Sequence, residues 1–192
     1  MTRLLLAAVL TFVPGIAAVQ HLMEGMAQSP VRVVIYEDLQ CPDCAVFRNM
    51  LDDTLLPRFA STVSFEHRDF PLAKHAWARK AAIAARFFEE AKPGLGLAYR
   101  KYSMANLRTI TADNFSDRLS QFASEYGVDA TKALAALSDT RLADLVEQDY
   151  QEGVARGIAH TPTVLVNGRP FIETFAVEDV AKAIDAELAA AK

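Results

Sequence analysis

Both cysteines of this 192-residue chain stand in one short motif, Cys41-Pro42-Asp43-Cys44. The motif follows an apolar run at 31–36 that is typical of a β-strand, and it opens a segment with helical periodicity. A structural disulfide stabilises a fold mainly by closing a long loop, and a bond between Cys41 and Cys44 would close almost none. The pair is therefore predicted to carry out chemistry and not to hold the fold together.

A helix N-terminus at this motif would suit redox work. With Cys41 as N-cap, Pro42 takes the first helical position, where its missing N–H costs nothing. Cys44 then follows one turn later on the same face, close enough for a disulfide with little backbone movement. The free N–H groups and the dipole at the helix start favour a thiolate. We therefore expect Cys41 to be an exposed nucleophile and Cys44 to be a buried resolving thiol.

The same spacing also forms half of many zinc sites, so a metal site must be weighed. Zinc would need two further ligands, and the histidines lie at no recognised zinc-finger spacing. These histidines are His21, His67, His75 and His160. A carrier of zinc or copper(I) stays open as an alternative of a different class. Disulfide exchange itself requires no metal and no organic cofactor.

Residues 1–18 resemble a secretory signal peptide. A short positive start precedes an apolar stretch at 4–13, then Pro14-Gly15 and small residues. We expect cleavage after Ala17 or Ala18, with an uncleaved membrane anchor as the alternative. Export would place the cysteines in an oxidising compartment, periplasmic or extracellular. A hydrophobic content of 52% allows a normal core, and a net charge of −4 without a basic patch argues against nucleic-acid binding.

The remaining pattern predicts an α/β frame that a helical block interrupts. Strands at 31–38 and 63–67 flank a helix at 42–59, which is the order of a right-handed βαβ unit. Helical patterns fill the next eighty residues, with aromatic stripes that indicate core packing. A hairpin turning at Asn167-Gly168 and a helix at 177–190 complete a four-stranded mixed sheet. The expected divisions are a tail at 19–30, the frame at 31–75 and 158–192, and the helical domain at 76–157.

Three segments carry a resemblance to a known family: Tyr36-Glu-Asp-Leu-Gln-Cys-Pro-Asp-Cys44, Arg68-Asp-Phe-Pro-Leu72, and Gly157-Ile-Ala-His-Thr-Pro-Thr-Val-Leu-Val-Asn-Gly168. In this order they are similar to the DsbA-like branch of the thioredoxin superfamily, exported thiol-disulfide oxidoreductases with a helical domain inserted in a thioredoxin fold. The resemblance spans about residues 31–190.

The resemblance implies a site around a second segment. Pro162 would be a cis proline beside the cysteines, although an X-Pro bond is trans by default. The backbone of Thr161 would pair with an extended substrate peptide. His160, which precedes Thr161, is a candidate to border the substrate groove, with an ordinary loop histidine as the alternative. The implied partners are reduced or misoxidised exported proteins and a membrane protein that recycles the pair. A tail of a dozen residues is too short for a dimerisation domain, so we expect a monomer.

Two departures from the family bear on the direction of the reaction. Asp43 stands where strongly oxidising members carry histidine, and its charge disfavours a Cys41 thiolate, so we expect a weaker oxidant. The buried acid that many relatives carry six residues before the first cysteine is replaced by Ile35. We hypothesise that Glu37 substitutes as proton acceptor for Cys44, the alternative being that Glu37 and Asp38 are solvated. An oxidase is the leading prediction, with a reductase or isomerase as alternative.

The remaining candidates have ordinary structural interpretations. We expect His67 and His75 to make surface or capping hydrogen bonds. Trp77 and Phe70 are expected to pack the sheet against the helical block.

Overall fold

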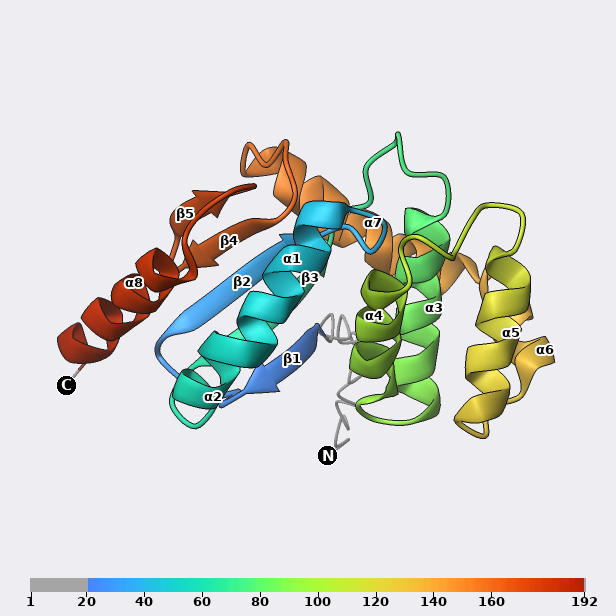
Figure 1. The fold of residues 1–192 in the computed structure, drawn as a ribbon, viewed down its shortest axis with the longest axis horizontal. Coiled ribbons are helices and arrows are strands. Elements are labelled where there is room, and N and C mark those ends of the chain that lie inside the picture. Colours follow the sequence, from blue (N-terminus) through green and yellow to red (C-terminus); the bar gives the residue numbers. More distant parts are fainter. Residues whose placement is uncertain (1–20, 192) are drawn as a thin grey trace, which may run out of the picture.

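The computed structural model describes residues 21–191, which form one mixed sheet with helices on both faces and a helical block at one end (Figure 1). The strands are β1 (Leu22–Gly25), β2 (Arg32–Glu37), β3 (Ser64–Asp69), β4 (Thr163–Val166) and β5 (Arg169–Ile172). Their order in the sheet is β1-β3-β2-β4-β5. Only β2 and β3 run parallel, as expected for strands joined by a crossover helix. The other three pairings are antiparallel.

The sheet has five strands where the sequence predicted four. The additional strand, β1, lies in the segment expected to be a polar tail, and it pairs with β3 from Leu22 opposite His67 to Gly25 opposite Ser64. Its four residues are too few to display an alternating pattern. On the covered face of β1, Leu22 is buried and Glu24 binds Arg48 and His67, so that face does not carry apolar residues alone.

The predicted helix at 42–59 is continuous but contains a wider turn. It consists of α1 (Pro42–Met50), a π-helical turn (Leu51–Leu55) and α2 (Leu56–Phe59). The π turn lies just before Pro57, which has no N–H for a regular helical hydrogen bond. The buried stripe of this helix runs through Cys44, Phe47, Leu51 and Leu55, and the apolar Val46 lies outside it, 52% exposed.

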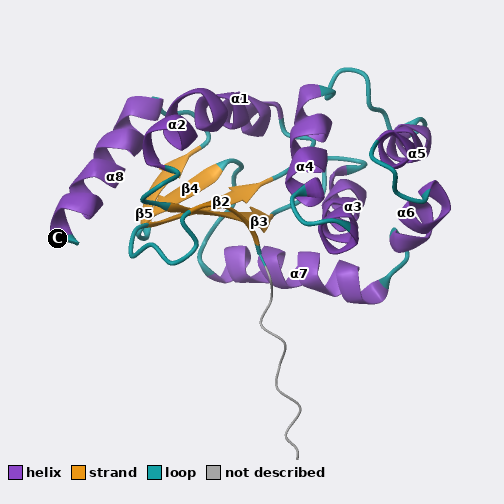
Figure 2. Ribbon diagram, turned by 90° about the horizontal axis from the view of Figure 1, so that it is seen from below, coloured by secondary structure: helices purple, strands orange, loops and turns teal. Residues whose placement is uncertain are grey.

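Helices cover the two faces of the sheet differently (Figure 2). The α1 helix and α8 (Val177–Ala190) lie over one face, and α7 (Thr140–Ala155) crosses the opposite face. The core between the sheet, α1 and α8 contains Val33, Ile35, Phe65 and Ile184. Phe70 stacks on Tyr150 of α7 at 4.7 Å between ring centroids, as expected for a residue that packs the sheet against the helical block.

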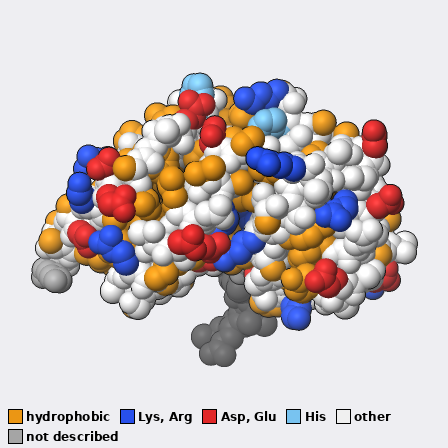
Figure 3. All heavy atoms as spheres, in the orientation of Figure 1, with side chains coloured by type: hydrophobic (Ala, Val, Ile, Leu, Met, Phe, Trp, Pro, Cys, Tyr) orange, Lys and Arg blue, Asp and Glu red, His pale blue; other side chains and the backbone are white. Residues whose placement is uncertain are grey.

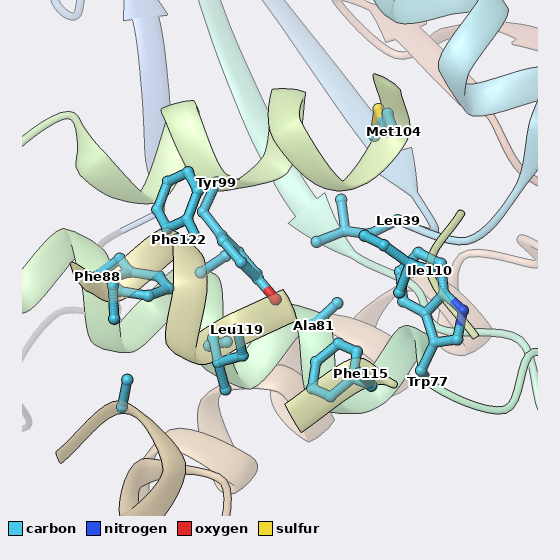
Figure 4. Packing of buried hydrophobic residues seen from close by; sticks show 14 of the residues in the cluster. Leu39, Trp77, Ala81, Phe88, Tyr99, Met104, Ile110, Phe115, Leu119 and Phe122 are labelled. Atoms are coloured by element: carbon cyan, nitrogen blue, oxygen red, sulfur yellow. The ribbon is translucent and has the colours of Figure 1, made fainter. Parts of the chain in front are cut away.

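The helical block beside the sheet contains α3 (Ala78–Ala91), α4 (Leu95–Ala105), α5 (Phe115–Glu125) and α6 (Ala130–Ala136). Asp129 and Asp139 cap α6 and α7, each accepting two backbone N–H bonds. The aromatic stripes form the core of the block (Figure 4). Trp77 stacks on Phe115, and Phe88 and Tyr99 surround Phe122. Leu39, Cys41 and Cys44 belong to the same apolar cluster, so the block directly supports the cysteine loop.

Within residues 21–191, no helix combines the length and the apolar character needed to cross a membrane. The predicted signal peptide at 1–18 lies outside the described residues.

Candidate active site

Cys41 and Cys44 occupy the first turn of α1, as the sequence predicted. Cys41 is the N-cap, with extended backbone angles, and Pro42 is the first helical residue. The Cys41 carbonyl accepts the first helical hydrogen bond, from the N–H of Ala45. Both thiols are free. Because α1 starts shortly after β2 ends, the motif lies at the C-terminal end of the central strand, beside the helical block (Figure 1).

Cys41 was expected to be exposed, and it is only 5% exposed. Apolar neighbours from the helical block and the backbone of Thr161 cover most of it. The pKa of Cys41 is nevertheless lowered to about 6. A hydrogen bond from the Cys44 side chain is the largest cause. Burial opposes it, while the Thr161 side chain and the backbone N–H groups of Cys44 and Asp43 add to it. Cys41 is therefore more acidic than an ordinary cysteine.

Cys44 is completely buried and differs sharply in acidity from Cys41. Burial raises the pKa of the Cys44 thiol well above its usual value, and the Cys41 sulfur and the charge of Glu37 raise it further. The backbone N–H of Asp38 donates to its Sγ at 3.4 Å, which offsets part of this effect. The roles expected for the two sulfurs, an acidic attacking thiol and a buried second thiol, match this asymmetry.

The segment His160-Thr161-Pro162 faces Cys41. The Thr161–Pro162 peptide bond is cis, as the resemblance implied. The Cys41 thiol lies 3.3 Å from the Thr161 carbonyl oxygen and donates to it when protonated. Two further bonds fix the segment: the Thr163 hydroxyl donates to the His160 carbonyl at 2.7 Å, and the N–H of Glu173 donates to the Pro162 carbonyl at 2.8 Å.

A pocket of about 370 Å³ opens beside Cys41. His160 borders it as expected, with its Nδ1 at 2.8 Å from a carboxylate oxygen of Glu173. Asp43, with a negative side chain, and Lys74, with a positive one, also line this pocket. Figure 3 shows hydrophobic side chains gathered around this end of α1, with charged and histidine side chains at the margin. The pocket can therefore accommodate a short length of an extended chain next to the sulfur.

Asp38 organises the loops around the pocket from a buried position. One carboxylate oxygen accepts the N–H of Gln40, and the other accepts the N–H of Leu72 and contacts His75 Nδ1 at 2.8 Å. His75 was expected to make a surface or capping hydrogen bond, and it instead contacts the buried carboxylate of Asp38, 37 positions away in the chain. Since Asp38 is 1% exposed, the alternative that it is a solvated strand-end residue is wrong.

Glu37 is also buried, at 3% exposure, so the solvated alternative is wrong for it too. Its carboxylate contacts His67 Nδ1 at 2.7 Å and accepts from Arg100 Nε at 3.0 Å. Burial alone would raise the pKa of Glu37, but the charges of Arg100 and His67 outweigh burial and lower it to about 2. A carboxylate with this acidity is a weak base, which counts against the hypothesis that it accepts a proton from Cys44.

Three residues of the site were missed or misplaced by sequence reasoning. His67 was expected at the surface and is 1% exposed, because β1 covers the edge of the sheet beside it. Arg100 was assigned no role. Its position within an apolar helical stretch was the available signal, since a buried arginine needs a carboxylate partner. Glu173 adopts a left-handed backbone conformation, with φ 54°, after β5, where the sequence offers no glycine to mark it.

The metal-site alternative finds little support in the arrangement of donors. His21, His67, His75 and His160 all lie within the described range, and there no group of three or more His, Cys, Asp or Glu side chains is arranged to hold a metal ion. His67 and His75 instead contact carboxylates, Glu37 and Asp38.

Several solved structures share the fold of this chain. BdbD from Bacillus subtilis superimposes with a TM-score of 0.77 at 22% identity, over 88% of this chain and 92% of that one. Alpha-DsbA1 from Wolbachia pipientis gives 0.74 at 17% identity, over 92% of each chain. DsbA from Chlamydia trachomatis gives 0.72 at 16%, over 92% of this chain and 95% of that one. All three share the fold of this chain.

Sequence comparison adds a family and a set of longer relatives. Two curated relatives are Na(+)/H(+) antiporters: NhaA 3 of Salinispora tropica, 27% identical over 88% of this chain, and NhaA of Herminiimonas arsenicoxydans, 26% identical over 85%. The chain spans about a quarter of the length of each. The profile of a family described as thioredoxin matches residues 18–186. The chain therefore belongs to the thioredoxin family, and its fold is that of the DsbA-like proteins, with a Cys-x-x-Cys pair at Cys41 and Cys44.

Proposed function

We propose that this protein is an exported thiol-disulfide oxidoreductase that exchanges disulfides with folding proteins through Cys41 and Cys44, acting as an oxidase. The observation that carries the proposal is the contact between the Cys41 sulfur and the Thr161 carbonyl beside a pocket at a helix start. An acidic thiol, a buried second thiol and a backbone carbonyl facing the pocket are what exchange with an extended peptide needs.

The oxidase reaction proceeds in two exchanges. In the oxidised protein, a client thiolate attacks the Cys41 sulfur, the Cys41–Cys44 bond breaks, and the electron pair leaves with Cys44. A second client thiolate then attacks the client sulfur of the mixed disulfide and releases Cys41 as thiolate. The client gains a disulfide and the protein is left as a dithiol. Because Cys41 ionises easily, it is a good leaving group, and this favours oxidation of the client.

The surrounding residues have distinct proposed roles. Pro42 and Asp43 tune Cys41 through the geometry and charge of the first turn, and Glu37 tunes Cys44. Thr161 and Pro162 pair with and orient the client backbone, and His160 borders the groove. The unit that performs the exchange is the frame at 31–75 and 158–192, with the helical domain at 76–157 as its cover.

Location and partners follow from the same proposal. Cleavage of residues 1–18 would release the protein into the periplasm or the medium, and an uncleaved segment would anchor it to the membrane. Its partners would be reduced or misoxidised exported proteins and a membrane protein that reoxidises the pair, with the chain acting as a monomer. Because the chain corresponds to about a quarter of each antiporter, ion transport is not part of the proposal.

The test is oxidative refolding of a reduced polypeptide with several cysteines. Wild-type protein should generate native disulfides, and Cys41→Ser should abolish this activity. Cys44→Ser lacks the Cys41–Cys44 disulfide that accepts the electrons, so it should not oxidise the reduced client either. With a client that already contains a disulfide, its Cys41 thiolate should attack that bond and form a mixed disulfide that no resolving thiol of the protein releases. If Cys41→Ser retained turnover, the proposed chemistry would be wrong.

The direction of the reaction is decided by equilibration with glutathione. A high reduction potential with no bound metal supports the oxidase. A low potential favours the reductase or isomerase, and stoichiometric zinc or copper in protein purified without chelators favours the metal carrier. Both of the last two results contradict the oxidase proposal.

A further inference from the structure

The carboxylate of Glu37 lies in a closed set of charged partners beneath the cysteine pair. One of its oxygens is 2.7 Å from His67 Nδ1, 3.0 Å from Arg100 Nε and 2.9 Å from Arg100 Nη2. All three side chains are at most 2% exposed. A hydrogen bond from Arg100 Nε, a ring nitrogen of His67 and a further guanidinium nitrogen around one oxygen are the surroundings of a carboxylate anion.

His67 links this anion to a second carboxylate. Its Nε2 lies 3.0 Å from Glu24, a residue of β1. Glu24 is itself bound by Arg48 at 2.6 Å and lies 3.6 Å from Lys101. With both carboxylates ionised, each ring nitrogen must donate, so His67 is an imidazolium. Burial would lower the pKa of His67, and the two carboxylates raise it instead.

Arg100 comes from the helical block. It lies on α4, and besides Glu37 it binds Asp69 at the end of β3. Asp69 also accepts from Arg86 of α3 at 2.7 Å. Two arginines of the block are thus anchored by carboxylates of the sheet, and Arg100 is held in place against Glu37.

The anion is close to the resolving sulfur. The amide that donates to Cys44 Sγ at 3.4 Å is that of the peptide bond between Glu37 and Asp38. In β2 the Glu37 side chain is on the same face as Val33 and Ile35, the face that α1 covers. The negative charge of Glu37 therefore projects from the sheet toward α1, the helix that carries the Cys44 sulfur.

We propose that Arg100 and His67 are positioning residues that keep Glu37 ionised beneath the cysteine pair, so that Glu37 acts on Cys44 through its charge and not as a proton acceptor. The inference deepens the proposed function, because it assigns what sets the reactivity of the second thiol. A proton from Cys44 could reach Glu37 only if Glu37 gave up stabilisation from two buried cations. A fixed anion instead holds Cys44 protonated, so that a mixed disulfide survives long enough for a client thiol to resolve it.

The two roles of Glu37 make opposite predictions for a reaction with a small reagent. Reduced protein is mixed with dithiobis(nitrobenzoate), whose disulfide Cys41 attacks with release of one thionitrobenzoate. The Cys44 thiolate then attacks the Cys41 sulfur, the bond to the second thionitrobenzoate breaks, and that group leaves with the electron pair. The second phase of colour release at neutral pH therefore reports the ionisation of Cys44.

Glu37→Gln removes the charge but keeps an acceptor for Arg100 and His67. We expect the second phase to become about three- to tenfold faster, as for a fall in the Cys44 pKa of about half to one unit. Glu66→Gln is the matched control, because Glu66 is an equally buried, arginine-bound residue whose side chain points to the opposite face of the sheet. It should leave the phase unchanged. A slower second phase in Glu37→Gln would mean that Glu37 accepts the proton of Cys44. An unchanged second phase would mean that the charge of Glu37 does not affect Cys44. Either result overturns the proposal.

The contribution of the positioning residues is read from the titration of Glu37 by carbon-13 NMR of its carboxylate. In the wild-type protein, Glu37 should stay ionised down to the pH at which the protein unfolds in acid. Arg100→Gln and His67→Gln should each move its midpoint upward, and Arg100→Lys should preserve it. If Arg100→Gln does not fold, His67→Gln still decides, since an unmoved midpoint there contradicts the proposed pairing. None of these measurements uses a protein client, so the proposal can fail while the oxidoreductase function stands.

Discussion

The Cys41 thiol lies 3.3 Å from the carbonyl oxygen of Thr161, although 120 positions separate the two residues in the chain. The contact requires a proton on the sulfur, because a thiolate has nothing to donate. Ionisation of Cys41 therefore releases the Thr161 carbonyl as a free acceptor at the edge of the pocket. The same holds when Cys41 is half of the Cys41–Cys44 disulfide, because the sulfur then carries no proton. In either state the carbonyl can accept a backbone N–H from an extended client, which is the pairing proposed for Thr161.

The acidity of Cys41 should depend on Cys44. Because the hydrogen bond from Cys44 is the largest cause of the lowered Cys41 pKa, Cys44→Ala should raise that pKa from about 6 by about one unit or more. Cys44→Ser, which keeps a donor, should shift it less. Thiolate absorbance in the ultraviolet measured against pH gives both values. Equal midpoints in wild type and Cys44→Ala would mean that the backbone N–H groups alone stabilise the thiolate.

Asp43→His should make the protein a stronger oxidant. The substitution removes a negative charge from the first turn of α1 and adds a group that can be positive, and both changes favour the Cys41 thiolate. The Asp43 side chain is exposed, so the effect should weaken as salt is added. The Cys41 pKa and the glutathione equilibrium at low and high salt test this prediction. Asp43→Asn separates the loss of charge from the arrival of an imidazole, and no change in either variant would exclude an electrostatic role.

The buried carboxylate of Glu37 should contribute to the stability of the fold in a defined pH range. Its pKa is about 2 in the folded protein against 4.5 as its ordinary value. A group whose pKa is lowered by folding stabilises the fold above its unfolded pKa and loses this contribution as the pH falls toward the folded pKa. The free energy of unfolding should therefore decline between pH 4.5 and about 2. In Glu37→Gln the decline should be shallower, as measured by urea unfolding. A surface control, Glu125→Gln, should follow wild type.

Gly153 should tolerate no side chain. A Cβ at this position of α7 would lie 2.7 Å from two ring carbons of Phe70 and 3.0 Å from the ring of Tyr36. Both rings are buried, so Gly153→Ala should destabilise the fold by about 1–3 kcal/mol, despite the better helix propensity of alanine. Val154→Ala, at an exposed neighbour on the same helix, should change stability by no more than about 0.5 kcal/mol. Thermal unfolding compares the two, and equal midpoints would mean that α7 can move away from the sheet.

The parts of the fold that the sequence predicts are those set by local rules. The hairpin from Thr163 to Ile172 and the helix from Val177 to Ala190 match the structure because turn chemistry and apolar periodicity act over a few residues. The start of α1 is likewise determined by Pro42. In contrast, β1 becomes a strand only because β3 presents an unpaired edge to it. No local pattern of four residues contains that information.

In the candidate site, too, the residues that belong to a local motif were predicted and those brought together by the fold were not. Cys41 and Cys44 are visible as a motif, and the family resemblance supplies Thr161 and Pro162. The charged partners of Glu37 were missed, because Arg100 and His67 reach it from different elements. The position of Arg100 in an apolar helical stretch indicates burial but does not identify the carboxylate that it binds. Burial of Cys41 was missed for a related reason: the atoms that cover it come from the helical block and from the segment around Thr161.

The two outermost strands, β1 and β5, are each only four residues long, and the second contains Pro170, which removes a backbone donor. A sheet bordered in this way offers few consecutive sites for another chain to extend it. For a protein proposed to meet unfolded polypeptides, this is a safeguard: incoming segments find an unsatisfied backbone group beside the reactive sulfur and little that would let them add to the sheet and aggregate.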